Sequence, residues 1–81
     1  MLRDSPKDEL VKLKNGTFAL VCCAWADRNE QVVILARVFI NETGEGFNKV
    51  VGEIHGPFLS QKDFNRKGAA LANIWFGRVD G

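Results

Sequence analysis

The chain has 81 residues, of which 46% are hydrophobic and 26% are charged. This composition is typical of one globular domain, and the length leaves no room for a second. A domain this short buries about 60% of the surface that its unfolded chain exposes, so we expect its stability margin to be small. The formal net charge of +1 is too small to indicate binding to nucleic acid or membranes from charge alone, so nucleic acid stays a possible partner that the charge does not indicate.

Residues 1–9 are polar and contain Pro6, so we expect a flexible N-terminal arm followed by a single domain over residues 10–81. Neither the N-terminus nor any later stretch has the apolar run of a signal peptide or a membrane span. The sequence therefore predicts a cytoplasmic protein with no membrane partner. In that compartment both cysteines are expected to be reduced.

Residues 11–40 have the pattern of three strands. Asn15-Gly16 lies between two apolar runs and predicts a two-residue hairpin turn, which would pair residues 11–14 with a strand from Thr17 onward. After the polar segment ADRNEQ, the run QVVILARVFI is dense in β-branched residues, as expected of a third strand.

Residues 49–81 predict a fourth strand and a helix. The strand KVVGEIHG follows a loop with two glycines and ends at Gly56-Pro57. Ser60 is placed to cap a helix with Asp63 at its third position, Leu59 and Phe64 have the spacing of a hydrophobic staple, and Gly77 is expected to end the helix. The predicted fold class is α+β: a four-stranded antiparallel β-meander followed by one C-terminal α-helix packed on one sheet face.

The neighbouring cysteines raise the question of a metal or redox site. Side chains alternate across a strand, so Cys22 and Cys23 are expected on opposite faces, where they cannot share a metal ion. His55 is the single histidine, which leaves too few ligands for a tetrahedral zinc site. We therefore predict that both cysteines are small core residues, with no metal and no cofactor.

Following the predicted turns divides the apolar residues between two sheet faces. The first face would carry Val11, Leu13, Phe18, Leu20, Cys22, Ala24, Val33, Leu35 and Phe39. The second face would carry Ala19, Val21, Cys23, Trp25, Val32, Ile34, Ala36, Val38, Ile40, Val50 and Ile54. A loop of three residues at Gly44-Glu45-Gly46 would place Glu53 opposite Arg37 and His55 beside Leu35.

One helix can cover only one of these faces, and uncovered apolar patches usually mark interaction sites. We therefore expect a homo-oligomer, most simply a dimer, with the alternatives that the arm or a curled sheet hides the second face or that another protein or an apolar ligand covers it. The predicted oligomer interface comprises Val21, Cys23, Trp25, Val32, Ile34, Val38 and Ile40.

The predicted function is therefore a non-catalytic interaction module of unknown specific role. Two other functions are the alternatives. A cysteine-dependent enzyme would need Cys23 near His55, but the predicted register places them on opposite faces, so no catalytic residue is expected. A regulator that binds single-stranded nucleic acid would use Lys12, Lys14, Lys49, Arg66 and Lys67. The order of four strands and one helix resembles that of the dimeric coactivators that bind single-stranded DNA, in topology alone and without a matching residue motif.

Overall fold

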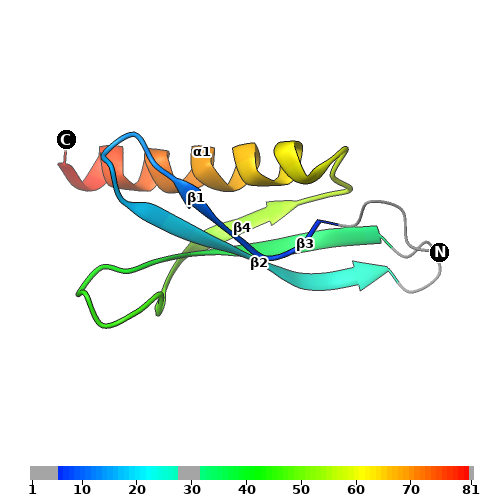
Figure 1. Cartoon of the computed structure of the whole chain (residues 1–81), viewed down its shortest axis with the longest axis horizontal. Helices are drawn as coiled ribbons and strands as arrows, with labels where there is room; N and C mark the ends of the chain where they lie inside the picture. The colour runs from blue at the N-terminus through cyan, green and yellow to red at the C-terminus, as the bar shows by residue number, and fades with distance from the viewer. Residues whose placement is uncertain (1–5, 28–31, 81) are drawn as a thin grey trace.

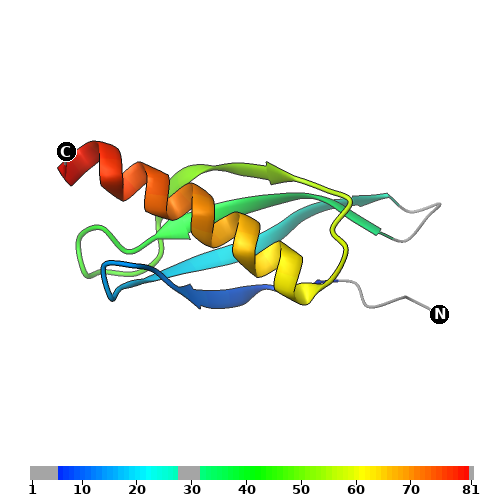
Figure 2. The ribbon, with the colours of Figure 1, turned by 90° about the horizontal axis from the view of Figure 1, so that it is seen from above.

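The computed structural model describes residues 6–27 and 32–80. Four strands precede one helix, as the sequence predicts: β1 (Glu9–Lys12), β2 (Phe18–Asp27), β3 (Val32–Ile40), β4 (Lys49–His55) and α1 (Gln61–Asp80). The strands form one antiparallel sheet in the order β1-β2-β3-β4, and the helix lies on one side of it (Figure 1). Seen from above, the helix crosses the sheet obliquely (Figure 2).

The register between β3 and β4 agrees with the predicted one, because Arg37 pairs with Glu53 and Leu35 pairs with His55. Between β2 and β3, Cys22 pairs with Arg37. The connection between β3 and β4 is longer than the predicted three residues, because it spans residues 41–48. Residues 28–31 of the polar segment ADRNEQ, which was expected to separate the second and third strands, lie outside the described residues.

The first hairpin differs from the prediction by one residue. Leu13 donates its amide to the Thr17 carbonyl at 2.8 Å, so the turn has three residues and not two. Gly16 ends it with φ of 89°, the left-handed conformation that three-residue hairpin turns need at this position. Because one residue of slip moves every side chain of a strand to the other face, Val11 pairs with Ala19 and leaves the predicted first face.

Register shifts on both sides of Trp25 and one between Val38 and Phe39 move further side chains between the faces. The register shifts between Cys23 and Trp25, which places Trp25 opposite Leu35 on the face away from Cys23. A second shift between Val38 and Phe39 places Val50 opposite Phe39. Both Trp25 and Val50 were predicted on the second face, and the bulges explain the difference.

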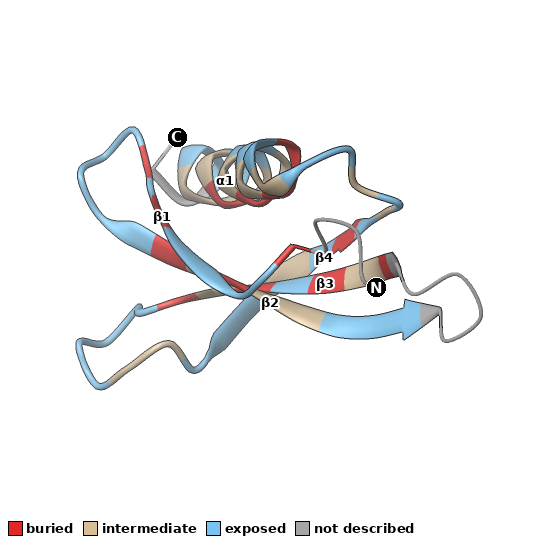
Figure 3. Ribbon diagram, turned by 45° about the vertical axis from the view of Figure 1, so that its right-hand side comes forward, coloured by how far each residue is buried: buried red, intermediate tan, exposed pale blue. Residues whose placement is uncertain are grey.

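The helix covers the sheet face that the sequence analysis left for a partner. Phe64 and Ala72 of the helix are fully buried against this face, which we call the helix-covered face (Figure 3). Its buried sheet residues are Val11, Leu13, Ala19, Val21, Ala36, Val38, Ile40 and Ile54. The hydrophobic core therefore lies between the helix and the sheet.

At the start of the helix, the predicted Ser60 cap is confirmed, whereas the predicted hydrophobic staple between Leu59 and Phe64 is wrong. The Ser60 hydroxyl accepts a hydrogen bond from the Asp63 amide at 3.1 Å. Leu59 is 89% exposed, and it is Phe58 that packs edge-on against Phe64, with 5.1 Å between ring centroids. The helix also continues through Gly77 to Asp80, because a glycine alone weakens a helix without ending it.

Two glycines allow the helix to lie close to the sheet. A Cβ atom at Gly68 would overlap the side chain of Val21, and one at Gly52 of β4 would lie 2.8 Å from a methyl group of Leu71. A larger residue at either position would have to push the two layers apart.

This close contact gives a test of the packing. We expect Gly68→Ala to lower the free energy of unfolding by about 1–2 kcal/mol, because the cost of overpacking exceeds the roughly 1 kcal/mol gained in helix propensity. Gly77→Ala is the matched control, since nothing lies within 4 Å of a Cβ atom there. It should raise the free energy of unfolding by up to about 1 kcal/mol. Urea unfolding of both variants measures the difference, and equal stabilisation would contradict the assigned contact.

Candidate functional site

The sheet face opposite the helix is the candidate functional site, and we call it the open face. Within the described residues no element lies across it (Figure 1). Leu10, Phe18 and Val50 are exposed to 51%, 47% and 47%, although all three are large apolar residues in strands. Side chains of this kind at a strand surface are normally buried, so this face is available to a further surface.

An apolar row crosses the open face over all four strands. Leu10 pairs with Leu20, Leu20 with Phe39, and Phe39 with Val50, so one residue from each strand lies in line. Paired residues of neighbouring antiparallel strands have Cβ atoms about 4.5–5.5 Å apart, which makes the row continuous. We call these four residues the apolar row.

Polar residues follow on the next row of the same face. Cys22 pairs with Arg37 and Arg37 with Glu53, and the Arg37 Nε atom lies 2.9 Å from a Glu53 carboxylate oxygen. Their side chains are 52% and 41% exposed, so the ion pair is solvated and contributes little to stability by itself. On this face the two side chains of the ion pair neutralise each other's charge beside the apolar row.

The predicted oligomer interface has to be corrected, because most of it lies beneath the helix. Val21, Val38 and Ile40 are fully buried within the chain, and Cys23 packs against the same core. Ile34 is half-buried. Among the described side chains of the predicted interface, only that of Trp25 is exposed, at 57%, because the register shift places it on the open face. The side chain of Val32 lies outside the described residues.

The two cysteines are free and lie on opposite faces of β2, as predicted. The Cys23 thiol donates to the Pro6 carbonyl at 3.2 Å, and the Cys23 amide donates to the Asp8 carboxylate at 2.8 Å. Partial burial, together with Asp8, raises the pKa of the Cys23 thiol to about 11 and raises that of Cys22 as well. Little thiolate is present near neutral pH, whereas a nucleophilic cysteine needs a lowered pKa.

The five predicted nucleic-acid contacts do not form one patch. Lys12 belongs to β1 and Lys14 to the turn that follows it, whereas Lys49 begins β4 at the opposite edge of the sheet. Arg66 and Lys67 lie on the helix and pair with the Asp63 carboxylate at 2.9 and 3.3 Å. This division does not match the continuous cationic groove that tracks a nucleic-acid backbone.

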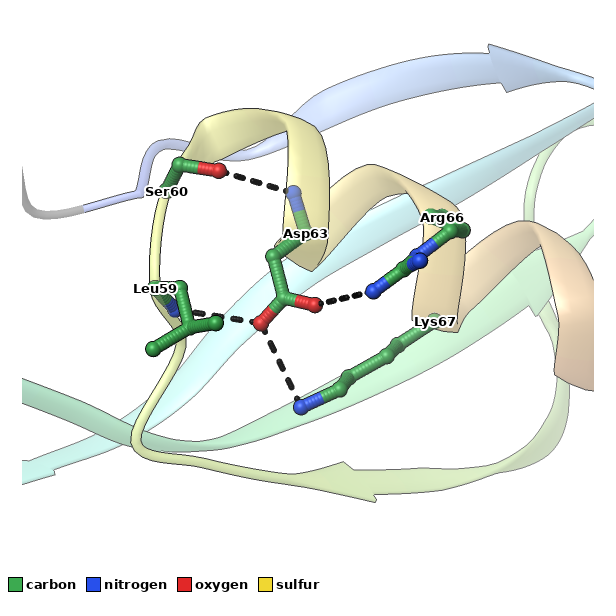
Figure 4. A network of polar contacts seen from close by, with 5 residues as sticks. All are labelled: Leu59, Ser60, Asp63, Arg66 and Lys67. Carbon is green, nitrogen blue, oxygen red and sulfur yellow. Dashed lines mark hydrogen bonds and ion pairs between the residues drawn. The ribbon is translucent and has the colours of Figure 1, made fainter.

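A shallow hollow of about 240 Å³ lies at the start of the helix, beside Leu59, Ser60, Lys62, Asp63 and Arg66. The buried carboxylate of Asp63 accepts the Leu59 amide at 3.0 Å and contacts both Arg66 and Lys67 (Figure 4). The Leu59 amide, and after it the cations, lower the pKa of this carboxyl. The charges at this helix end therefore compensate one another.

In the part of the chain that the structure describes, no group of three histidine, cysteine or acidic residues is placed to hold a metal ion. Over the same residues, no helix has the length and hydropathy needed to cross a bilayer. Comparisons with models of protein families, with curated proteins and with solved structures found no match.

Leu10 belongs to neither predicted face, and Leu20 and Phe39 were predicted on the face that the helix was expected to cover. The apolar pattern of β1 alone could not reveal this, because ELVK is compatible with either register. The three-residue turn decides the register, and Asn15-Gly16 is equally compatible with a two-residue turn.

The raised thiol pKa values predict slow alkylation at neutral pH. With Cys22→Ser removing the other thiol, the rate of Cys23 reaction with iodoacetamide should rise about tenfold per pH unit between pH 8 and 10, because only the thiolate reacts. Mass spectrometry of quenched samples measures the rate. A rate that is already constant above pH 8 would contradict the environment described for Cys23.

The Asp63 carboxyl predicts an acid-dependent loss of stability. Its pKa is lower in the folded chain than the usual value of about 3.9, so the unfolded chain takes up the proton first. The stabilisation is therefore complete well above pH 4 and is lost as the pH falls below it. We expect Asp63→Ala to lower the urea midpoint at pH 7, with the difference from the unaltered protein shrinking at pH 3. Glu45→Gln, in the exposed loop after β3, should show no such difference.

Proposed function

We propose that the protein is a non-catalytic interaction module that associates with further copies of itself through the open face. The observation that supports this proposal is the apolar row, which crosses four strands, is exposed at Leu10 and Val50, and is left uncovered by the helix. Association would remove these side chains from water, which is the dominant driving force in most protein–protein contacts. A chain this short buries a small share of its surface on folding, so burial against a second copy would add to its stability.

Neutralisation of the open face supports a protein partner over a polyanion. Arg37 is paired with Glu53 within the chain, so the centre of the face offers no unpaired cation to a phosphate. The thiols support a non-catalytic function, because Cys23 lies on the helix-covered face and His55 on the open face. No arrangement of described residues favours the nucleic-acid alternative over self-association.

The size of the face predicts a weak, concentration-dependent association. Four strands spaced about 4.8 Å apart give a face roughly 19 Å wide. Specific interfaces bury about 800 Å² per partner, and a face of this width reaches at most the lower end of that class. The mass must therefore be measured over a wide range of protein concentration.

Leu10→Glu tests the proposal directly. Sedimentation equilibrium of the unaltered protein should show a mass that rises toward a dimer with concentration, whereas the variant should need at least tenfold more protein to reach the same mass. A charge within an apolar contact is unfavourable in the dimer and solvated in the monomer. Because Leu10 is already 51% exposed, the variant should keep its fold.

Ile74→Glu is the matched control, since Ile74 is 54% exposed on the helix, on the other side of the sheet. This variant should associate as the unaltered protein does. Circular dichroism of both variants checks that the fold is kept. A protein that stays monomeric at all concentrations would refute self-association, and equal weakening by both substitutions would refute the open face as its site.

A further inference from the structure

We infer that Asn15 is a site of self-modification, at which its side-chain amide reacts with the backbone of Gly16 and is converted to isoaspartate. The site lies in the turn between β1 and β2, where Asn15, Gly16 and Thr17 are all exposed. The reaction needs water and no other reactant. This inference does not depend on the proposed self-association, because it concerns the chemistry of one turn within one chain.

The pair Asn15-Gly16 supplies the reacting groups. The backbone nitrogen of the residue after an asparagine can attack the side-chain carbonyl carbon and close a succinimide ring. A side chain on that following residue crowds the attack, and glycine has none. Asn15 is the only asparagine of the chain that glycine follows. Apart from the neighbouring residues, no heavy atom lies within 4 Å of the position that a Cβ atom of Gly16 would occupy, so the approach is open.

Thr17 provides two hydrogen-bond donors to the oxygen that becomes negative in the reaction. The Asn15 Oδ1 atom accepts the Thr17 amide at 3.0 Å and the Thr17 hydroxyl at 2.6 Å. When the Gly16 nitrogen attacks, negative charge develops on this oxygen. Two donors already aimed at it stabilise that charge, as the donors of an oxyanion hole do. The same two bonds span Gly16, so they hold the side-chain carbonyl beside the attacking residue.

The reaction conserves atoms and needs no oxidant or reductant. The Gly16 nitrogen gives its proton to hydroxide and bonds to the Asn15 Cγ atom, while the bond from Cγ to Nδ2 breaks and ammonia leaves with a proton from water. Water then opens the ring: attack at the former backbone carbonyl gives isoaspartate, and attack at the former side-chain carbonyl gives aspartate. The Gly16 amide donates to the Leu13 carbonyl at 3.1 Å, and this bond must open first. The bonds between Asn15 and Thr17 do not involve Leu13, so they do not depend on it.

Isoaspartate changes the length of the turn that sets the register of β1. Its main chain runs through the former side-chain carbons, so a methylene is added to the backbone between Lys14 and Gly16. Leu13 and Thr17 close this turn as a hydrogen-bonded pair, and the register of a hairpin is fixed by its loop length. The former Oδ1 atom also becomes a backbone oxygen, which moves the acceptor of both Thr17 bonds. Modification therefore weakens the first hairpin, through which Val11 and Leu13 enter the core.

Peptide mapping by mass spectrometry tests the site. The protein is incubated at pH 7 and at pH 9 and then digested in acid, and each asparagine is followed through the mass gained when its NH2 group is replaced by OH. We expect Asn15 to react at least about tenfold faster than any other asparagine, because glycine alone leaves the attack uncrowded. The reaction should be faster at pH 9, because the Gly16 nitrogen must lose its proton.

Asn41 is the internal control. Its Oδ1 atom also accepts two backbone amides, those of Gly44 at 2.7 Å and Gly46 at 3.3 Å, but Glu42 follows it in the chain. Asn41 should therefore stay largely unmodified while Asn15 reacts. Equal rates at Asn15 and Asn41 would overturn the assigned site.

Thr17→Val measures the contribution of the hydroxyl, because it removes one donor and keeps the amide and the β-branched shape. We expect a reaction at Asn15 that is slower by about threefold or more, a smaller loss than in a buried oxyanion hole because water can replace the hydroxyl at this exposed site. Thr43→Val, in the loop after β3, is the matched control and should leave the rate at Asn15 unchanged. Circular dichroism checks that both variants keep the fold. An unchanged rate in Thr17→Val would overturn the role of the hydroxyl.

The stability of the product tests the effect on the turn. Chromatography separates the isoaspartyl form from the unaltered protein and from the aspartyl product. Its urea midpoint should be lower than that of Asn15→Asp, which carries the same charge at this position without the added methylene. Equal midpoints would overturn the effect of the modification on the hairpin.

Discussion

The left-handed backbone at Gly16 determines which residues of β1 reach the core. It closes a three-residue turn in which Leu13 and Thr17 form the last hydrogen-bonded pair. With one residue fewer in the turn, Val11 would point away from the helix and Leu10 would point toward it. The period of two along a strand makes this choice all-or-none. The exposed Leu10 and the buried Val11 are thus two consequences of one turn.

The helix is then fixed over the core by small residues beneath it and by amides along its side. Gly68 and Gly52 remove the side chains that would hold the layers apart. The Gln61 side chain accepts the Lys7 amide at 2.8 Å and donates to the Lys7 carbonyl at 3.0 Å, and Asn73 accepts the Lys14 amide at 3.0 Å. These bonds tie the helix to the backbone at both ends of β1. Because the helix is committed to this face, it cannot also shelter the apolar row.

The sequence predicts the order of the elements and the register between β3 and β4, because alternation, β-branched runs and cap residues are local signals. The Arg37–Glu53 pairing was predicted from the length of the loop, and it is found. The connection is longer than predicted, and the bulge near Val51 restores the predicted register. Bulges leave no comparable signal. Ala24 and Val51 are ordinary strand residues in the sequence, yet the shifts near them move Trp25 and Val50 to the open face.

The missing sequence signals for the turn length and the bulges also explain why the predicted oligomer interface was placed on the helix-covered face. Both faces are apolar enough to take a helix, so hydrophobicity alone does not decide between them. Side-chain size decides between them: Gly68 lets the helix backbone approach Val21, and the covered face also carries the small side chains of Ala19 and Ala36, both fully buried. The open face presents Leu20 and Phe39 at the equivalent positions of β2 and β3, which would hold a helix farther away.

The edges of the sheet are protected, so that association through the open face would end at a dimer. An unpaired edge strand can recruit further strands without limit, whereas a two-fold contact between faces closes on itself. Gln61 already occupies the Lys7 backbone groups just before β1, and β4 carries a bulge and the charged side chains of Lys49 and Glu53. Both edges are thus poor templates for strand addition. Under the proposed self-association, these edges leave the open face as the surface for a second copy, and a two-fold contact there would end at a dimer.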